Sequence, residues 1–189
     1  MIINGLQKLT LLDYPEHTAC TVFLAGCNFR CPFCHNSEIL NLATAQPLMD
    51  EKELLAFLQK RQGLLDGVCI TGGEPTLRND LPELFREIKK LGFKTKLDTN
   101  GTNPAMIKKL VDETIVDYIA MDIKAAPDNY ENLTGVGVDM DAIKESAHYI
   151  MFCGIDYEFR TTVVKGLHQA KDFEAIGQWL KNARAYYLQ

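Results

Sequence analysis

Short apolar stretches alternate with longer amphipathic stretches along the whole chain, roughly every 30 residues, and this rhythm limits the folds open to it. The apolar stretches predict buried strands over residues 18–24, 68–71, 93–98, 116–123 and 155–163, and the start of a sixth strand at 186–189. The amphipathic stretches between them predict helices. This alternation is typical of a parallel sheet built from strand–helix–strand units, so we predict an α/β fold.

Capping signals support the predicted helices. Asp50 and Glu53 have the spacing of a capping box at the start of the first predicted helix. Asn103 precedes Pro104, which suits the first turn of the third predicted helix. Five units and a sixth strand are too few for a closed eight-fold barrel. The pattern alone leaves open whether the sheet curls into a partial barrel or lies open with helices on both faces.

Residues 1–18 are predicted to form a lead-in strand or hairpin that ends in a turn at Pro15. The remainder, 19–189, carries the alternating pattern without a linker, so we predict one domain over 1–189. A length of 189 residues is enough for one such core.

Charge and cysteine usage narrow the class of protein. The net charge of −5 argues against a general nucleic-acid binder, which would be basic. No signal peptide and no apolar run of about 20 residues is visible, so we predict a cytoplasmic protein with no membrane segment and with reduced thiols. Of the six cysteines, Cys20, Cys69 and Cys153 stand alone in or beside apolar stretches and are expected to be buried.

Unusual polar motifs follow the predicted strands one after another. They are the cysteine-rich loop 26–36, Gly72-Gly73-Glu74-Pro75, Asp98-Thr99-Asn100-Gly101, Asp122-Ile123-Lys124 and, late in the fifth strand, Arg160. The carboxyl ends of parallel strands share one edge of the sheet, where α/β proteins bind their ligands. We therefore expect these motifs to form one site.

The cysteine-rich loop holds Cys27, Cys31 and Cys34 in the spacing C-x3-C-x2-C. A structural zinc site would require four ligands, and no fourth is evident. A [4Fe–4S] cluster takes one thiolate per iron, so three cysteines would leave one iron open for chemistry. A zinc-stabilised binding protein remains the non-enzymatic alternative.

This spacing, with Phe33 before the last cysteine, resembles the cluster motif of the radical S-adenosylmethionine (SAM) enzymes. The continuation His35-Asn36 is similar to that of the glycyl-radical-enzyme activating proteins, above all the anaerobic ribonucleoside-triphosphate reductase activating protein. The pyruvate formate-lyase activating enzyme is a relative. The resemblance implies a partial (β/α)6 barrel of the radical SAM type, one [4Fe–4S] cluster on the three cysteines, and SAM.

The resemblance also implies residues that bind SAM. They are Gly73 and Glu74 at its amino group, with Gly72 of the same motif, Phe33 near its adenine, His35 and Asn36 of the activating-enzyme motif, and Lys124 and Arg160 at its carboxylate or ribose. The alternative for the two glycines is a tight strand-to-helix turn without a ligand.

A second group of residues matches a monovalent-cation site next to the SAM carboxylate. It comprises Asp98, Thr99 and Asp122 with the carbonyl group of Ala120. The alternative for these residues, and for Lys124 and Arg160, is an ion-pair network that closes the rim of the barrel.

The implied reaction is reductive cleavage of SAM to methionine and a 5′-deoxyadenosyl radical, which takes a hydrogen atom from a glycine Cα of a partner enzyme. The first candidate partner is anaerobic ribonucleoside-triphosphate reductase. The alternatives are another glycyl radical enzyme, such as pyruvate formate-lyase, and a small-molecule or peptide substrate. The electron donor is expected to be a flavodoxin- or ferredoxin-like protein.

Overall fold

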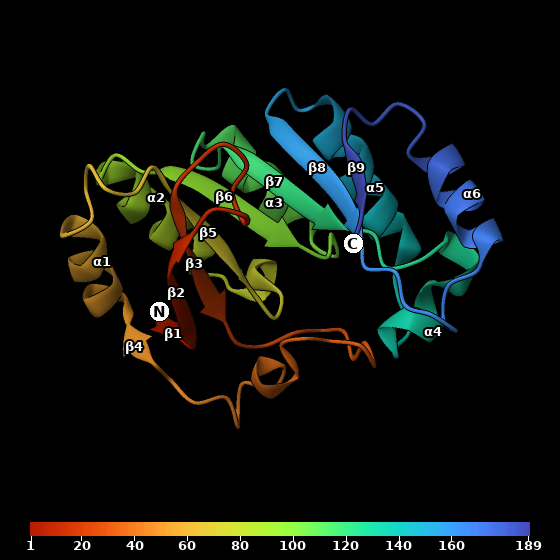
Figure 1. The fold of residues 1–189 in the computed structure, drawn as a ribbon, viewed down its shortest axis with the longest axis horizontal. Helices are drawn as coiled ribbons and strands as arrows, with labels where there is room; N and C mark the ends of the chain where they lie inside the picture. Colours follow the sequence, from red (N-terminus) through yellow and green to blue (C-terminus); the bar gives the residue numbers. More distant parts are fainter.

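The computed structural model describes residues 1–189, and its centre is a sheet of seven strands in the order β2-β3-β5-β6-β7-β8-β9 (Figure 1). The strands are β2 (Gly5–Thr10), β3 (Ala19–Leu24), β5 (Gly67–Gly72), β6 (Lys94–Thr99), β7 (Tyr118–Asp122), β8 (Asp156–Thr161) and β9 (Tyr186–Leu188). All neighbouring pairs are parallel except β2 with β3. The six strands expected from the apolar stretches are therefore confirmed, each within a few residues of its predicted bounds.

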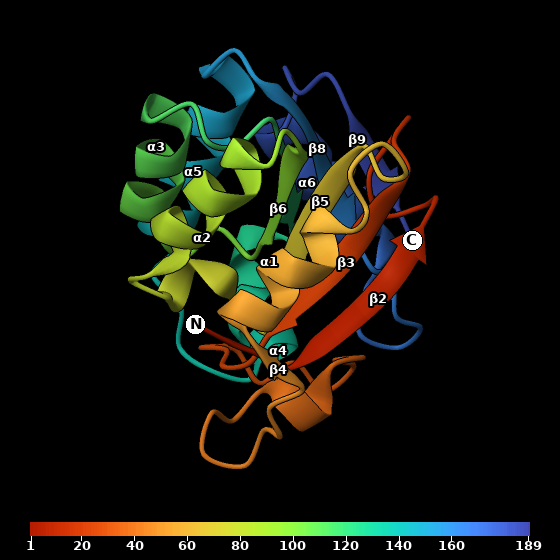
Figure 2. The same ribbon diagram turned by 90° about the vertical axis from the view of Figure 1, so that its left-hand side faces the viewer.

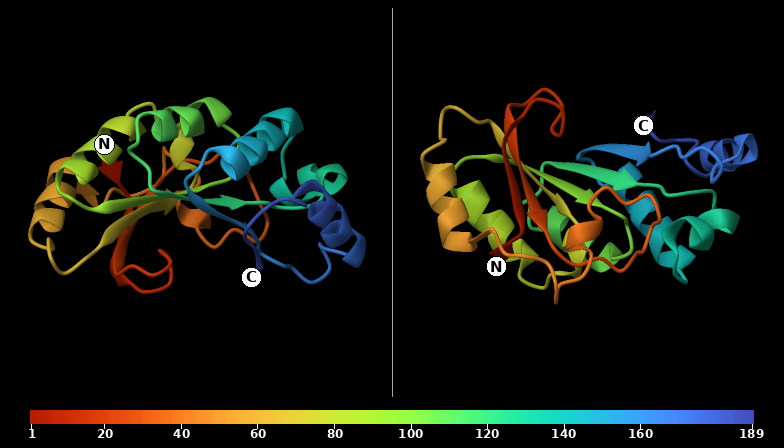
Figure 3. Two further views of the ribbon diagram at one scale, coloured as in Figure 1. Left: turned by 90° about the horizontal axis from the view of Figure 1, so that it is seen from above. Right: turned by 60° about the horizontal axis from the view of Figure 1, so that its bottom comes forward.

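The helices are α1 (Glu51–Gln59), α2 (Leu81–Lys90), α3 (Pro104–Asp112), α4 (Tyr130–Thr134), α5 (Met140–Phe152) and α6 (Ala170–Trp179). Helices α1, α2, α3 and α5 lie along the same outer side of the sheet (Figures 2 and 3). Because the parallel strands follow one another in chain order and never reverse, the sheet curls as an incomplete barrel. The partial-barrel prediction is confirmed, and the open doubly wound alternative is excluded.

Local sequence signals explain where the helices begin. The Asp50 side chain accepts a hydrogen bond from the Glu53 backbone N–H at 2.9 Å, and the Glu53 carboxylate accepts one from the Asp50 N–H at 2.8 Å. Asn103 caps α3 by accepting from the Met106 N–H at 3.1 Å. The buried faces of these helices, including Leu54 in α1, pack on the sheet in one core cluster.

The lead-in segment contains more structure than its sequence predicts. Its strand β2 is the expected lead-in strand and pairs antiparallel with β3, but β1 (Ile2–Ile3) also pairs with β4 (Met49–Asp50) in a separate two-stranded sheet. Glu16 has a φ of 64°, a left-handed conformation that disfavours side chains with a Cβ. The structure contains no helix that combines the length and apolar character needed to cross a membrane.

Three short 3-10 turns complete the fold: Ser37–Ile39, Pro75–Leu77 and Pro127–Asn129. Cys20 and Cys69 are buried in the sheet as expected, whereas Cys153, just after α5, is only partly buried. The parallel strands β3, β5, β6, β7 and β8 place their carboxyl ends at one edge, so the loops that follow them meet there.

Candidate active site

A cavity of about 300 Å³ opens at the carboxyl ends of the parallel strands. The side chains and glycines that the sequence placed in the site line it: Cys27, Cys31, Phe33, Cys34, His35, Asn36, Gly72, Gly73, Glu74, Asp98, Thr99, Asp122, Lys124 and Arg160. Ala120, whose carbonyl was expected in the cation site, is buried in β7 and does not line the cavity. The convergence expected from the strand ends is therefore observed in the structure.

The cysteine loop is fastened to the fold by its own backbone. The N–H groups of Gly26 and Cys27 donate to the carbonyls of Ile39 and Leu40 at 2.8 and 3.1 Å. The Arg30 N–H donates to the carbonyl of Thr134, at the end of α4, at 2.7 Å. These bonds close the loop between β3 and the Ser37–Ile39 turn, and they hold the three thiols at the cavity wall.

The thiols are partly buried, and two of them resist ionisation. Burial raises the pKa of Cys27 to about 11, although the Phe29 N–H donates to its sulfur at 3.4 Å. Burial also raises the pKa of Cys31. Both thiols are therefore protonated at neutral pH until a metal displaces the protons.

The arrangement of the donors bears on the choice between a cluster and zinc. No three His, Cys, Asp or Glu side chains are grouped closely enough in the structure to hold one metal ion. A tetrahedral zinc site would require such a group, whereas an iron–sulfur cluster binds each thiolate at a different iron. The three cysteines all line the cavity, so each thiolate is available to a different iron of one cluster.

Gly72 and Gly73 are required by close contact with the end of β3 and the start of the cysteine loop. A Cβ on Gly72 would lie 2.2 Å from the Leu24 carbonyl oxygen, and one on Gly73 would lie 2.1 Å from the Gly26 carbonyl oxygen. The same two carbonyls accept hydrogen bonds from the N–H groups of Gly73 and Glu74 at 2.8 and 2.7 Å. The motif therefore joins the end of β5 to the start of the cysteine loop. The two glycines are needed for this tight turn whether or not they also contact a ligand.

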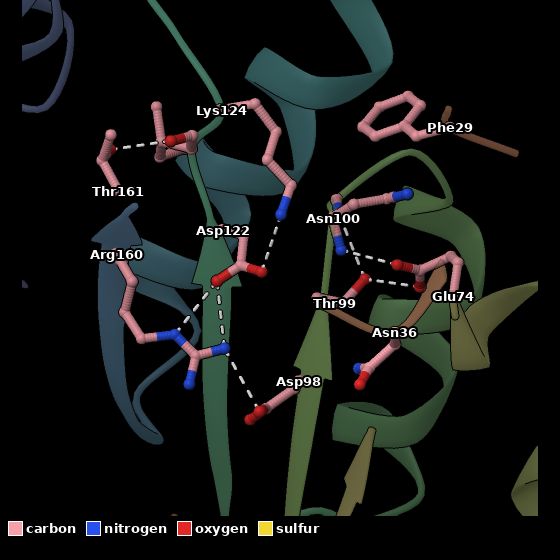
Figure 4. Close-up of polar contacts among 12 residues, drawn as sticks. Phe29, Asn36, Glu74, Asp98, Thr99, Asn100, Asp122, Lys124, Arg160 and Thr161 are labelled. Carbon is pink, nitrogen blue, oxygen red and sulfur yellow. Dashed lines mark hydrogen bonds and ion pairs between the residues drawn. The ribbon is translucent and has the colours of Figure 1, made fainter. Parts of the chain in front are cut away.

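Glu74 is buried, and its carboxylate accepts hydrogen bonds from the two turns that flank it (Figure 4). Its donors are the Thr76 N–H at 3.1 Å, the Thr76 hydroxyl, the Thr99 hydroxyl at 2.8 Å and the Asn100 N–H at 2.6 Å. Burial raises the pKa of this carboxyl against the opposing effect of its donors. The side chain thereby ties the turn after β5 to the turn after β6.

Asp98 lies between two cationic side chains. Its Oδ1 is 2.7 Å from Lys96 Nζ, and its Oδ2 is 3.2 Å from an Arg160 terminal nitrogen. Burial opposes ionisation of Asp98, but the charges of Arg160 and Lys96 outweigh it and lower the pKa of the carboxyl. Lys96 also lies 3.8 Å from Glu158.

Asp122 is paired in the same way at the end of β7. Its Oδ1 is 3.0 Å from both Arg160 Nε and a terminal nitrogen of Arg160, and its Oδ2 is 2.9 Å from Lys124 Nζ. Burial opposes the charge, but Lys124 and Arg160 hold the pKa of Asp122 well below its usual value. The structure thus contains the ion-pair network that was the alternative for these residues (Figure 4).

Two supporting residues, Lys96 and His168, were missed in the sequence. Lys96 could have been recognised, because it lies two residues before Asp98 on the same face of one strand. His168 could not, because the loop that carries it is remote in sequence. Its Nε2 donates to the Lys124 carbonyl at 2.9 Å while its Nδ1 accepts from the Val164 N–H at 3.1 Å.

The remaining predicted residues connect the loops around the cavity. The Asn36 amide donates to the Gly72 carbonyl at 3.1 Å, and the Phe33 ring meets the His168 ring edge-on with centroids 6.4 Å apart. His35 is exposed at the cavity mouth.

Comparison with known proteins defines the class. The family model of the radical SAM superfamily matches residues 21–180, and the chain belongs to this superfamily. Enzymes of the superfamily use a [4Fe–4S] cluster and SAM, so the chain is an oxidoreductase with these cofactors.

Individual relatives indicate which radical SAM enzymes the chain resembles. The chain is 32% identical over 197 residues to a protein of Methanocaldococcus jannaschii assigned as a glycyl-radical enzyme activating enzyme, covering 100% of this chain and 79% of the relative. It is 29% identical over 189 residues to the pyruvate formate-lyase-activating enzyme of Clostridium pasteurianum, covering 96% of this chain and 77% of the relative. The solved structure of Streptococcus suis SuiB bound to S-adenosylmethionine matches in fold, with a TM-score of 0.67 and 17% identity over 89% of this chain and 41% of SuiB.

The residues present fit these cofactors. Three thiols, the ligand type that iron–sulfur clusters require, line one wall of the cavity, and charged and polar side chains from four further strand ends line the rest. The expected monovalent cation fits less well, because every carboxylate oxygen of Asp98 and Asp122 already lies within 3.2 Å of a lysine or arginine nitrogen.

Proposed function

We propose that this protein activates a glycyl radical enzyme by radical SAM chemistry, and that it acts in the cytoplasm. The observation that carries the proposal is that three thiols and the motifs after four further strands line one cavity. The support from relatives is the likeness to activating enzymes over nearly the whole chain.

In this proposal Cys27, Cys31 and Cys34 would hold three irons of a [4Fe–4S] cluster and leave the fourth iron open to SAM. When bound, the cluster and SAM would supply the reductive, radical-forming chemistry that activates the partner's glycine. The fold excludes water and orients SAM against the substrate, as proteins do for other cofactors.

The remaining cavity residues orient SAM. The turn Gly72–Glu74 faces its amino group, and the Glu74 carboxylate keeps that turn in place through Thr76 and Asn100. Phe33 would pack against the adenine, and His35 and Asn36 line the same cavity. Lys124 and Arg160 would donate hydrogen bonds to the SAM carboxylate or ribose, since cationic side chains bind carboxylates well.

The partner that we propose first is anaerobic ribonucleoside-triphosphate reductase, on the strength of the Cys34-His35-Asn36 continuation. Several relatives are pyruvate formate-lyase-activating enzymes, and they favour pyruvate formate-lyase as a second candidate. The SuiB structure has also been solved with its precursor peptide, so a peptide substrate is the third. The electron donor in each case is a flavodoxin- or ferredoxin-like protein.

The test is anaerobic incubation of the reconstituted protein with SAM, dithionite and each candidate partner, followed by electron spin resonance. A glycyl doublet on one partner, with methionine and 5′-deoxyadenosine in stoichiometric amounts, is expected. Cys34→Ala should abolish both signal and SAM cleavage. Cys153→Ala is the matched control, because Cys153 lies outside the cavity and should leave both unchanged.

Three results would change the assignment. A colourless protein that retains zinc after reconstitution would refute the radical SAM proposal. SAM cleavage without a doublet on any partner would favour a small-molecule or peptide substrate. A doublet on pyruvate formate-lyase alone would refute the reductase as partner.

A further inference from the structure

The residues that resemble a monovalent-cation site are already neutralised by the chain. Asp98 and Asp122 present four carboxylate oxygens, and each lies 2.7 to 3.2 Å from a nitrogen of Lys96, Lys124 or Arg160. The Thr99 hydroxyl, the third expected ligand, donates to Glu74 at 2.8 Å and accepts from the Gly101 N–H at 3.1 Å. A cation at these groups would share each carboxylate oxygen with a lysine or arginine nitrogen that already contacts it, and it would lie close to those positive charges.

The charges of this network balance. Lys96, Lys124 and Arg160 supply three positive charges. The carboxylates of Asp98, Asp122 and Glu158 supply three negative charges, and Glu158 lies 3.8 Å from Lys96 and 3.7 Å from Arg160. The network itself therefore carries no net negative charge that would attract a further cation to Asp98 or Asp122.

Lys96 supplies the third positive charge that makes the network neutral. Its side chain is 1% exposed in the middle of β6, and its ammonium lies 5.7 Å from the centre of the Tyr118 ring. A buried ammonium is strongly unfavourable unless paired, so this position requires a compensating charge. Burial lowers the pKa of Lys96, but Asp98 more than restores it, so the side chain remains charged.

We propose that the Lys96 ammonium takes the place of a bound monovalent cation beside Asp98, so that the cavity binds SAM without an alkali metal ion. Lys96 is then a positioning residue: it fixes Asp98, which fixes one side of the Arg160 guanidinium, while Asp122 fixes the other. This inference rests on the proposed function, because SAM is taken as the ligand of the cavity.

The test compares two salts of equal ionic strength, KCl and choline chloride, each at about 0.15 M. Two properties of the reconstituted protein are measured under anaerobic conditions: the dissociation constant for SAM by calorimetry, and the melting temperature without SAM. For the wild-type protein both should be the same in the two salts, the dissociation constant within about twofold.

The matched variants are Lys96→Ala and Lys94→Ala. Lys94 lies in the same strand, but its side chain is exposed at the far end of β6. Lys96→Ala removes the charge and opens space beside Asp98, so its SAM affinity should become at least about fivefold tighter in KCl than in choline chloride. Its melting temperature should rise with KCl alone, and Lys94→Ala should behave as the wild type does.

Two outcomes would overturn the proposal. One is a wild-type protein that binds SAM more tightly or melts higher in KCl than in choline chloride. The other is a Lys96→Ala protein that remains indifferent to the salt. If Lys96→Ala does not fold, the comparison of the wild-type protein in the two salts decides alone. If SAM binds in neither salt, the proposed function fails. The melting temperatures in the two salts then still show whether the protein binds potassium.

Discussion

Replacing Glu74 with glutamine should destabilise the protein because it turns one acceptor into a donor. The four donors on the carboxylate come from Thr76, Thr99 and Asn100, on two different turns. Glu74→Gln keeps the shape of the side chain. However, if the amide oxygen takes the three donors on Oε1, its NH2 group faces the Asn100 N–H.

The magnitude follows from this single mismatch. A buried N–H left without an acceptor costs about 1–3 kcal/mol, and hydrogen bonds to a charged acceptor are stronger than average. The loss is partly offset, because burial of the Glu74 charge is itself unfavourable and raises the pKa of the carboxyl. We expect a net loss of about 2 kcal/mol, which corresponds to up to a 30-fold change in the folded-to-unfolded ratio.

The assay is urea unfolding of wild-type and variant proteins prepared in the same way, followed by circular dichroism. The slope of the transition should be unchanged while its midpoint falls. Glu113→Gln is the control, because Glu113 pairs with Arg86 at 2.8 Å near the surface, where solvent screens such pairs and they contribute little to stability. A Glu74→Gln protein as stable as Glu113→Gln would refute the reasoning, since the carboxylate would then not hold the two turns together.

Three further changes test other parts of the structure. Gly73→Ala should reduce both stability and SAM binding, because its Cβ would meet the Gly26 carbonyl oxygen at 2.1 Å; unchanged unfolding and calorimetric titrations would contradict this. Glu16→Gly should stabilise the protein by up to about 1 kcal/mol, because it relieves a φ of 64°, and a lower urea midpoint would contradict it. The lowered pKa values of Asp98 and Asp122 mean that their contribution to stability is full above the usual carboxyl pKa of 3.8 and is lost as pH falls below it. The stability difference between the wild type and Asp122→Asn should therefore shrink in acid, and a difference that grows as pH falls would contradict this sign.

The strands and the edge that carries the site could be predicted because both depend on local patterns. Apolar runs mark the buried strands, and the motif at Gly72 or at Asp98 follows its strand directly in sequence. The partners of each side chain were harder to predict. The bond between Glu74 and Asn100 joins two turns whose separation depends on how β5 packs beside β6.

Two features of the fold lie beyond local pattern. Helix α4 spans only Tyr130–Thr134, too few residues for an amphipathic period to show. The curl of the sheet depends on strand order and on helices sharing one side, which no single segment encodes. The pairing of Lys96 with Asp98 was within reach, because residues two apart in a strand share a face.

The backbone bonds that fasten the cysteine loop have a consequence for an oxygen-labile metal centre. The loop is tied at Gly26, Cys27 and Arg30 by N–H groups that donate to the protein's own carbonyls, none of which involves the thiols. Loss of iron on exposure to air should therefore leave the scaffold standing, and repair would require only fresh iron, sulfide and reductant rather than a new round of folding.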